Sequence, residues 1–181
     1  LASGIHILMY DGTNFVLLSA AASALSVSQF PAGTTIDRAY ATYTTCTALT
    51  TVLPNDDTIP QNTEGTQILS ASLTPKSTTN RIRITFRGSA GANSTSTPPV
   101  AAIFVNSTAN ALTAQQCPVN CGVGPLTILH EYVPGTTATQ TINVRVGPGS
   151  AGTVFLNGNT STTRQFGGVQ AATLILEEIV A

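Results

Sequence analysis

The chain has 181 residues, of which 42% are hydrophobic and only 8% are charged, and its net charge is −1. A chain of this length and hydrophobic content can bury a core as one domain, so it is not a disordered tail. The near-zero net charge excludes a strong electrostatic attraction to nucleic acid or to anionic lipid. Few charges also leave little repulsion between copies, and we therefore expect the chain to hide part of its surface in an obligate oligomer.

We expect no membrane insertion, because no apolar run approaches the roughly 20 residues that cross a bilayer. The longest apolar runs, at residues 5–10 and 173–176, have the length of strands. The chain does not start with a basic segment followed by an apolar one, so we expect no signal peptide. Because the first residue is Leu1, we expect the chain to be a C-terminal piece of a longer protein.

The beginning of the chain predicts a β-hairpin. Residues 5–10 and 15–18 are apolar, and the Asp11-Gly12 pair between them is a strong turn signal. The only stretch that fits a domain boundary is Phe-Pro-Ala-Gly at residues 30–33. We therefore predict two parts, a hairpin with its connection at residues 1–33 and a larger domain at residues 34–181.

The larger part is predicted to consist of short strands separated by turn residues. The clearest strand is residues 81–87, where Ile82, Ile84 and Phe86 alternate with polar side chains, as in a strand with one buried face. Residues 88–99 are polar and contain Gly, Ser and Pro, which predicts a flexible loop. The other predicted strands lie at residues 39–53, 67–74, 100–105, 112–115, 126–133, 139–146, 154–156 and 173–180. Regularly spaced strands of this kind predict an all-β fold, an antiparallel β-sandwich of the jelly-roll type.

The three cysteines do not form a complete disulfide framework, because their number is odd. Cys117 and Cys121 enclose the short segment CPVNC and can form one loop disulfide, which would leave Cys46 free. The alternative is that all three are buried thiols. A zinc site needs more ligands than this pattern supplies, so we predict no metal and no cofactor.

No group of residues in the sequence predicts catalysis. A Ser or Cys nucleophile needs an activating base beside it, and His6 and His130 are the only histidines. His130 lies in an alternating strand, where its neighbour Glu131 points to the opposite face. The carboxylates that cluster in one loop, at residues 56–64, are explained by turn chemistry rather than by a glycosidase pair. We therefore predict that the chain is not an enzyme.

Two segments carry a more specific pattern, DDTIPQNTEG at residues 56–65 and LTPKSTTNRIRI at residues 73–84. Together they resemble the D-D-T-I-P-Q-x-x-E-G … T-P-x-S-x-x-N-x-L-x-I pattern of C-terminal domains in tailed-phage fibre proteins. The end of the chain is similar too, with GGV at residues 167–169 and TLILEEI at residues 173–179. The opening hairpin YDGTNF resembles the segment that often precedes such domains. The resemblance covers most of the chain and leaves residues 88–121 unmatched.

The resemblance implies a β-sandwich tip that forms a homotrimer about a fibre axis and meets the host surface. It therefore predicts an extracellular protein on the exterior of the virion that attaches to a bacterial surface polysaccharide or another host receptor, beside other virion proteins. Two alternatives remain open. One is a capsid decoration or fibre-capping protein without receptor binding, and the other is a hydrolase of surface polysaccharide.

The residues of the first motif are predicted to have a structural role. Proline and glycine stiffen and turn the chain, and short acidic side chains accept hydrogen bonds from backbone N–H groups in turns. Glu64 is a candidate for a salt bridge to an arginine of another subunit. The motif residues concerned are Asp56, Asp57, Pro60, Gln61, Glu64 and Gly65.

A glycan site needs aromatic rings for the C–H faces of sugars and polar groups for their hydroxyls. The chain has no Trp, and its longest variable-looking loops lie at residues 89–98, 109–124 and 157–168. Long loops carry function more often than strands do. On this basis the predicted ligand contacts are Tyr132, Arg164, Gln165 and Phe166.

Overall fold

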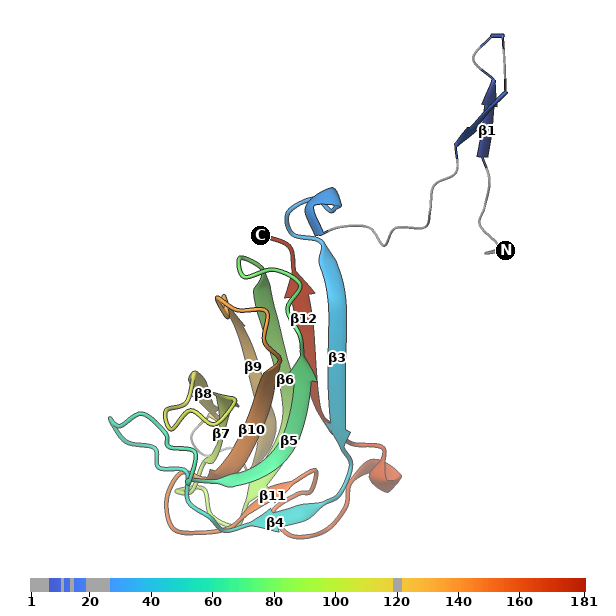
Figure 1. The fold of residues 1–181 in the computed structure, drawn as a ribbon. Helices are drawn as coiled ribbons and strands as arrows, with labels where there is room; N and C mark the ends of the chain where they lie inside the picture. The colour runs from blue at the N-terminus through green and yellow to red at the C-terminus, as the bar shows by residue number, and fades with distance from the viewer. Residues whose placement is uncertain (1–6, 11, 14, 19–26, 119–121) are drawn as a thin grey trace. The chain divides into compact units, whose positions relative to one another are not determined.

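The computed structural model describes residues 7–10, 12–13, 15–18, 27–118 and 122–181, and the chain divides into the compact units Leu1–Pro31 and Ala32–Ala181 (Figure 1). This division lies close to the predicted boundary after residue 33. In the first unit, β1 (Ile7–Tyr10) and β2 (Phe15–Leu18) pair antiparallel, and a short helix η1 (Val27–Gln29) follows.

The second unit is built from strands in the part of the chain that the structure describes, with one short helix η2 (Phe166–Gly168). The strands pair antiparallel throughout, which confirms the predicted all-β, antiparallel fold. The jelly-roll order and the homotrimer stay predictions. The strands are β3 (Thr35–Tyr43), β4 (Thr47–Leu49), β5 (Thr66–Leu73), β6 (Arg81–Ala92), β7 (Pro99–Val105), β8 (Thr113–Gln116), β9 (Val123–Tyr132), β10 (Gln140–Pro148), β11 (Val154–Leu156) and β12 (Ala172–Ile179).

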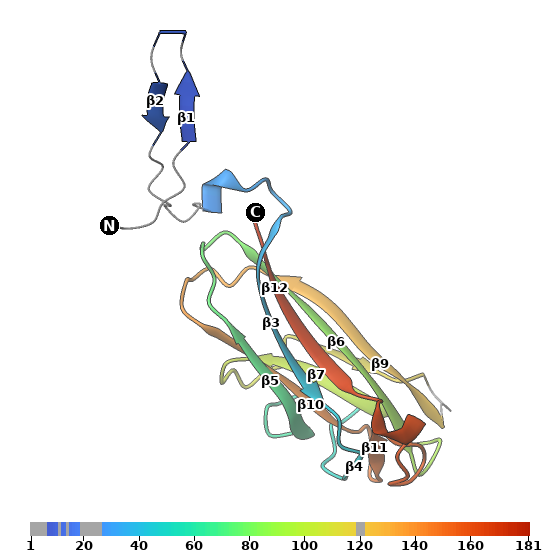
Figure 2. The ribbon, with the colours of Figure 1, turned by 90° about the vertical axis from the view of Figure 1, so that its right-hand side faces the viewer.

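These strands form two sheets. The four-stranded sheet has the order β5-β10-β7-β8, and the six-stranded sheet has the order β3-β12-β6-β11-β4, with β9 on the other side of β6. Figure 2 shows β3, β12, β6 and β9 side by side. β6 is long enough to pair with β12 over its first half and with β11 at its end, while β9 accompanies it along almost its whole length. β3 and β9 are therefore the two edges of this part of the sheet.

The hydrophobic core lies between the two sheets, because each strand turns every second side chain inward. Phe86 of β6 and Leu174 of β12 are fully buried on one side, and Ile103 of β7 and Val144 of β10 are fully buried on the other. The alternation seen in residues 81–87 is thus the inner and outer face of one strand. Among the described residues, neither short helix has the length and apolar character of a membrane span.

The structure corrects two strand predictions. Residues 39–53 do not form one strand, because the chain leaves β3 after Tyr43, where the partner is β12, and begins β4 at Thr47, where the partner is β11. Residues 88–92 are not a loop but the end of β6, where Ala90 and Gly91 pair with β9 on one side and with β11 on the other. Small residues occur there because space is short: a Cβ on Gly91 would collide with the backbone carbonyl of Asn159.

The end of the last strand is locked to the β5–β6 connection. Glu178 is fully buried, and its carboxylate accepts hydrogen bonds from the backbone N–H of Lys76 and the side-chain amide of Asn80, both at 2.6 Å. Glu177 points outward, 3.9 Å from Arg83. The second fibre-like segment and the fibre-like C-terminal end therefore meet in one buried polar contact.

Candidate functional site

The segment 54–65, which carries the first fibre-like pattern, lies over the outer side of the four-stranded sheet. Val100, Ala102 and Phe104 of β7 point to this side and are buried with Leu53 in a second apolar cluster. Leu53 is fully buried, and its N–H donates to the carbonyl of Pro148 at 2.9 Å. The segment therefore covers apolar side chains that would otherwise face solvent.

Hydrogen bonds within and around this segment fix its shape. The Gln61 N–H donates to the Glu64 carboxylate at 2.8 Å, and the Glu64 N–H donates back to the Gln61 carbonyl at 2.9 Å. The Ala111 N–H donates to the Pro60 carbonyl at 2.9 Å, which joins the segment to the loop before β8. The Glu64 carboxylate thus holds its own loop, and no ion pair to it occurs among the described residues.

Gly65 ends the segment in a conformation that needs glycine. Its φ is +60°, and a Cβ there would lie 2.7 Å from the Leu53 side chain. Arg145 donates hydrogen bonds from its guanidinium to the carbonyls of Glu64 at 2.6 Å and Gly65 at 2.9 Å. A backbone turn, a buried leucine and a part-buried polar contact therefore meet at one residue.

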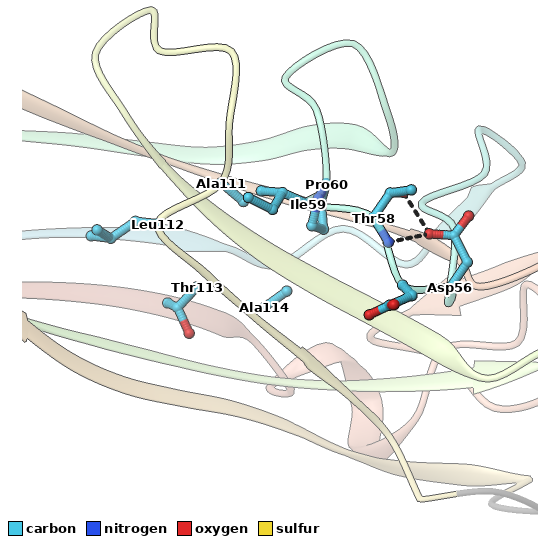
Figure 3. Close-up of a pocket in the computed structure, with 9 residues that line it drawn as sticks. Asp56, Thr58, Ile59, Pro60, Ala111, Leu112, Thr113 and Ala114 are labelled. Carbon is cyan, nitrogen blue, oxygen red and sulfur yellow. Dashed lines mark hydrogen bonds between the residues drawn. The ribbon is translucent and has the colours of Figure 1, made fainter.

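A hollow of about 400 Å³, called the Asp56 hollow, lies beside this segment and the start of β8 (Figure 3). The Thr58 hydroxyl and N–H both donate to the Asp56 carboxylate, and these bonds hold the pKa of Asp56 below its ordinary value of 3.8. In the described residues no group of three His, Cys, Asp or Glu side chains can hold a metal ion. The Asp56 carboxylate thus holds its own turn, and Asp57 also lines the hollow. The hollow is lined by Asp56, Asp57, Thr58, Ile59, Pro60, Ala111, Leu112, Thr113 and Ala114.

A second hollow of about 410 Å³, called the Phe166 hollow, lies where the loop 157–170 meets the ends of β6 and β9. The loop begins at Asn157, whose side-chain amide donates to the carbonyls of Tyr43 at 2.7 Å and Thr45 at 3.3 Å. The hollow is lined by Ser89, Val123, Gly124, Pro125, Asn159, Gln165, Phe166 and Gln170, none of which is charged.

Phe166 has the most unusual geometry in this loop. Its φ is +50° and its side chain is 78% exposed, although aromatic residues rarely adopt left-handed backbone. Gly167 and Gly168 follow with φ of +64° and +90°, so the chain turns sharply after the ring. The Arg164 side chain lies against Gly168, where a Cβ would meet its guanidinium. Strained backbone that presents an exposed ring is a feature of binding sites rather than of cores.

Gln170 supplies a polar group that lacks a partner. Its Oε1 is buried and accepts no hydrogen bond among the described residues, although its residue lines the Phe166 hollow. A buried acceptor without a partner is costly, and such groups in native structures call for an explanation.

The structure brings together three of the four predicted ligand residues. Gln165 and Phe166 line the Phe166 hollow, and Arg164 lies beside it. Val123, which lines the hollow, begins β9, and Tyr132 ends it. At roughly 3.3 Å per residue, these two residues are about 30 Å apart. Burial raises the pKa of Tyr132 to about 12. Tyr132 is therefore not part of this site.

Sequence reasoning missed other residues of the hollow. Ser89 comes from β6, Gly124 from β9, and Asn159 and Gln170 from the loop 157–170, and the pairing of β6 with β9 and β11 brings these three segments to one end of the sheet. None of them lies in a local pattern of its own. Ser89, Gly124 and Asn159 fall within the long loops predicted at residues 89–98, 109–124 and 157–168, but the sequence does not single them out there, and Gln170 lies outside these loops.

The cysteines and histidines lie outside both hollows where they are described. Cys46 is a free thiol and Cys117 is disulfide-bonded, while Cys121 lies outside the described residues. His130 shares the inner face of β9 with Ile84 of β6, as their pairing shows, and Glu131 points the other way. His6 lies outside the described residues.

Comparison with known proteins adds little to this description. No protein-family model and no curated protein matches the chain. The chain is similar to a chain of the T=1 particles derived from infectious bursal virus, with a TM-score of 0.39 and 13% identity over 97% of this chain and 44% of that one. It is similar to the VP2 subviral particle of infectious bursal disease virus, with a TM-score of 0.37 and 10% identity over 98% of this chain and 42% of that one. It is also similar to the enzymatically active domain of tailspike protein 4 of bacteriophage CBA120, with a TM-score of 0.28 and 16% identity over 66% of this chain and 18% of that one. The chain thus spans less than half of these viral chains, and the TM-scores are too low to assign a function.

Proposed function

We propose that this chain is the attachment domain of a tailed-phage fibre, on the exterior of the virion, and that it acts as a homotrimer that binds a bacterial surface glycan. The fibre-like segments at residues 56–65 and 73–84 support the virion assignment. The Phe166 hollow supports the glycan. The proposal assigns no catalytic step to the chain.

The observation that carries the glycan assignment is the exposed Phe166 ring beside an uncharged hollow. Sugars present C–H faces that stack on aromatic rings, and their hydroxyls need polar partners such as amides. The side-chain amides of Asn159, Gln165 and Gln170 and the hydroxyl of Ser89 line the same hollow. One ring with several amides around it matches the two chemical sides of a sugar.

The lining of the Phe166 hollow favours binding without cleavage. Glycosidases place two carboxylates about 5 to 10 Å apart around the bond that they cut. The hollow is lined by no carboxylate and no histidine in the part of the chain that the structure describes. The hydrolase alternative would therefore need a different site.

Binding of the purified chain to an array of bacterial surface polysaccharides, and to intact bacteria, tests the proposal. Phe166→Ala should weaken binding at least about tenfold, because aromatic anchors in the centre of an interface carry much of the binding energy. Val169→Ala is the matched control, since Val169 is 84% exposed in the same loop but does not line the hollow. New reducing ends in the bound polysaccharide would support the hydrolase instead. Failure to bind any glycan or cell, with tight binding to capsids, would support the decoration protein.

A further inference from the structure

The outer face of the six-stranded sheet carries an ordered row of charges. We use "outer face" for the side chains of β3, β12, β6 and β9 that point away from the core. Across these four strands Arg38, Glu177, Arg83 and Glu131 stand in register, so the signs alternate from one edge to the other. Arg83 lies 2.7 Å from Glu131 and 3.9 Å from Glu177. The charged row thus begins with a cation at the β3 edge and ends with an anion at the β9 edge.

The next row along the strands is mainly apolar. It runs from Tyr40 through Ile175 and Thr85 to Leu129, again in register. The two ends of this row are the most exposed, with Tyr40 at 71% and Leu129 at 68%. This row therefore places one large, exposed apolar side chain at the β3 edge and one at the β9 edge of the same face.

The chain has few charges, yet it concentrates its arginines on this face. Of the seven Lys and Arg residues in the chain, Arg38 lies on the edge strand β3, and Arg81, Arg83 and Arg87 lie on the central strand β6. Interfaces between proteins are enriched in Arg and aromatic residues and depleted in Lys. The side chain of Arg38 makes no ion pair among the described residues, although it is the end of the charged row.

We propose that copies of this chain associate through the outer face, with the β3 edge of one copy against the β9 edge of the next. This inference rests on the homotrimer of the proposed function and specifies its contact. Rotation about an axis parallel to the strands keeps every row at its own height. It therefore brings Arg38 to Glu131 of the next copy and Tyr40 to Leu129 of the next copy.

A second copy fits this face better than an unrelated partner because the two edges complement each other. The charged row ends at the β3 edge in Arg38, which has no ion-pair partner among the described residues, and at the β9 edge in Glu131. Glu131 also pairs with Arg81 and Arg83, and the apolar row ends in a large apolar group at both edges. An interface that joins one edge to the other, head to tail, closes into a ring when the rotation allows it. The long edge strands β3 and β9 also expose backbone groups that neighbouring chains can cover.

Disulfide trapping tests this arrangement directly. Tyr40→Cys and Leu129→Cys are placed together in a Cys46→Ser background and oxidised. Within one chain β3 and β9 are three strand spacings apart, about 14 Å, whereas a disulfide needs Cα atoms within about 7 Å. A link between these positions must therefore join two copies. Covalent trimers on a non-reducing gel are expected.

An equal mixture of the two single variants is the matched control, because no copy then carries both cysteines and linkage stops at dimers. Only monomers, or only dimers after complete oxidation of the double variant, would overturn the proposed contact. Tyr40→Asp should raise the dissociation constant of the oligomer at least about tenfold in light scattering, as loss of an interface anchor does. Ile59→Asp, at an apolar residue that is 55% exposed beside the Asp56 hollow, should not. Glycan binding is measured separately, so a trimer that binds no glycan sinks the proposed function while leaving this contact intact.

Discussion

The loops at residues 54–65 and 157–170 both border a hollow of similar volume, but they are built in opposite ways. The first is bonded to distant segments at several points, including the carbonyls that accept from Arg145 and the Pro60 carbonyl that accepts from Ala111. The second is anchored at Asn157 and then bonds mostly within itself, as in the hydrogen bond from the Ser161 N–H to Asn159. It ends by exposing Phe166 on strained backbone.

The difference teaches that the segment with the most recognisable sequence is not the best candidate for binding. The carboxylates and the glycine of residues 56–65 are used to hold the loop over apolar side chains. The side chains of the loop 157–170 make few hydrogen bonds to other segments, so they are available to a ligand. The recognisable motif thus serves the fold, and the proposed ligand contacts lie in the less distinctive loop.

The largest expected effect is on Gly65. Gly65→Ala should lower the free energy of unfolding by about 3 kcal/mol, because it combines strained backbone with a clash against Leu53. Gly167→Ala is the matched change in the other loop, since its φ is also positive, +64°, but nothing lies within 4 Å of the added Cβ. It should cost only about 1 kcal/mol. Urea denaturation measures both, and equal losses would mean that the two loops are equally constrained.

The next effect concerns the acceptor that closes the first loop. Glu64→Ala should cost about 1 to 2 kcal/mol, because the part-buried Gln61 N–H loses its partner. Glu64→Gln keeps an acceptor oxygen at this position and should stay close to the parent chain in the same denaturation experiment. If Gln is as damaging as Ala, the charge of Glu64 and not its hydrogen bond stabilises the loop.

A smaller effect of opposite sign is expected at Phe166. Phe166→Asn should raise the free energy of unfolding by about 0.5 to 1 kcal/mol, because Asn tolerates left-handed backbone and the exposed ring packs little. The same variant should lose glycan binding, so that stability and function move apart. A loss of stability in this variant would mean that the ring is a packing residue and that the contrast between the loops is smaller than described.

The smallest effect is expected from acid. The pKa of Asp56 is lowered from 3.8 by its bonds to Thr58, so its contribution to stability is present above pH 3.8 and is lost as the pH falls through the lower native value. The amide signal of Thr58 should therefore titrate below pH 3.8 in NMR spectra, and Asp56→Asn should abolish the titration. The amide of Phe166 should not move in this range, because residues 157–170 contain no Asp or Glu. Titration of both amides would show that the loops are coupled.

Much of the sheet architecture is visible in the sequence, because alternation such as that of Ile82, Ile84 and Phe86 directly reflects one buried face. The hydrophobic pattern fails to predict a strand where pairing with neighbouring strands and close packing outweigh the local composition. Residues 88–92 are small and include two glycines, as a loop does, yet they extend β6 with Ala90 and Gly91 paired on both sides, and Gly91 is required by the close approach of Asn159.

The candidate site was predictable only in part. The aromatic ring of Phe166 and the side-chain amide of Gln165 belong to a long loop, so both could be predicted from the sequence. Ser89 and Gln170 could not be singled out, although Ser89 begins one of the predicted functional loops, because their place in the hollow depends on strand pairings between distant segments. The prediction of Tyr132 as a ligand contact rests only on its aromatic ring. The residue type does not indicate which end of β9 it occupies.

β12 is the last strand of the sequence, yet it lies between β3 and β6 near the middle of the six-stranded sheet. On the ribosome, the earlier strands therefore emerge without the neighbour that joins them. Contacts between strands so far apart in sequence form slowly, since the intervening chain must first be closed into a loop. The sheet is completed only when residues 172–179 have been synthesised, and a nascent chain halted before that point is left with two unpaired strand edges and a core open to solvent.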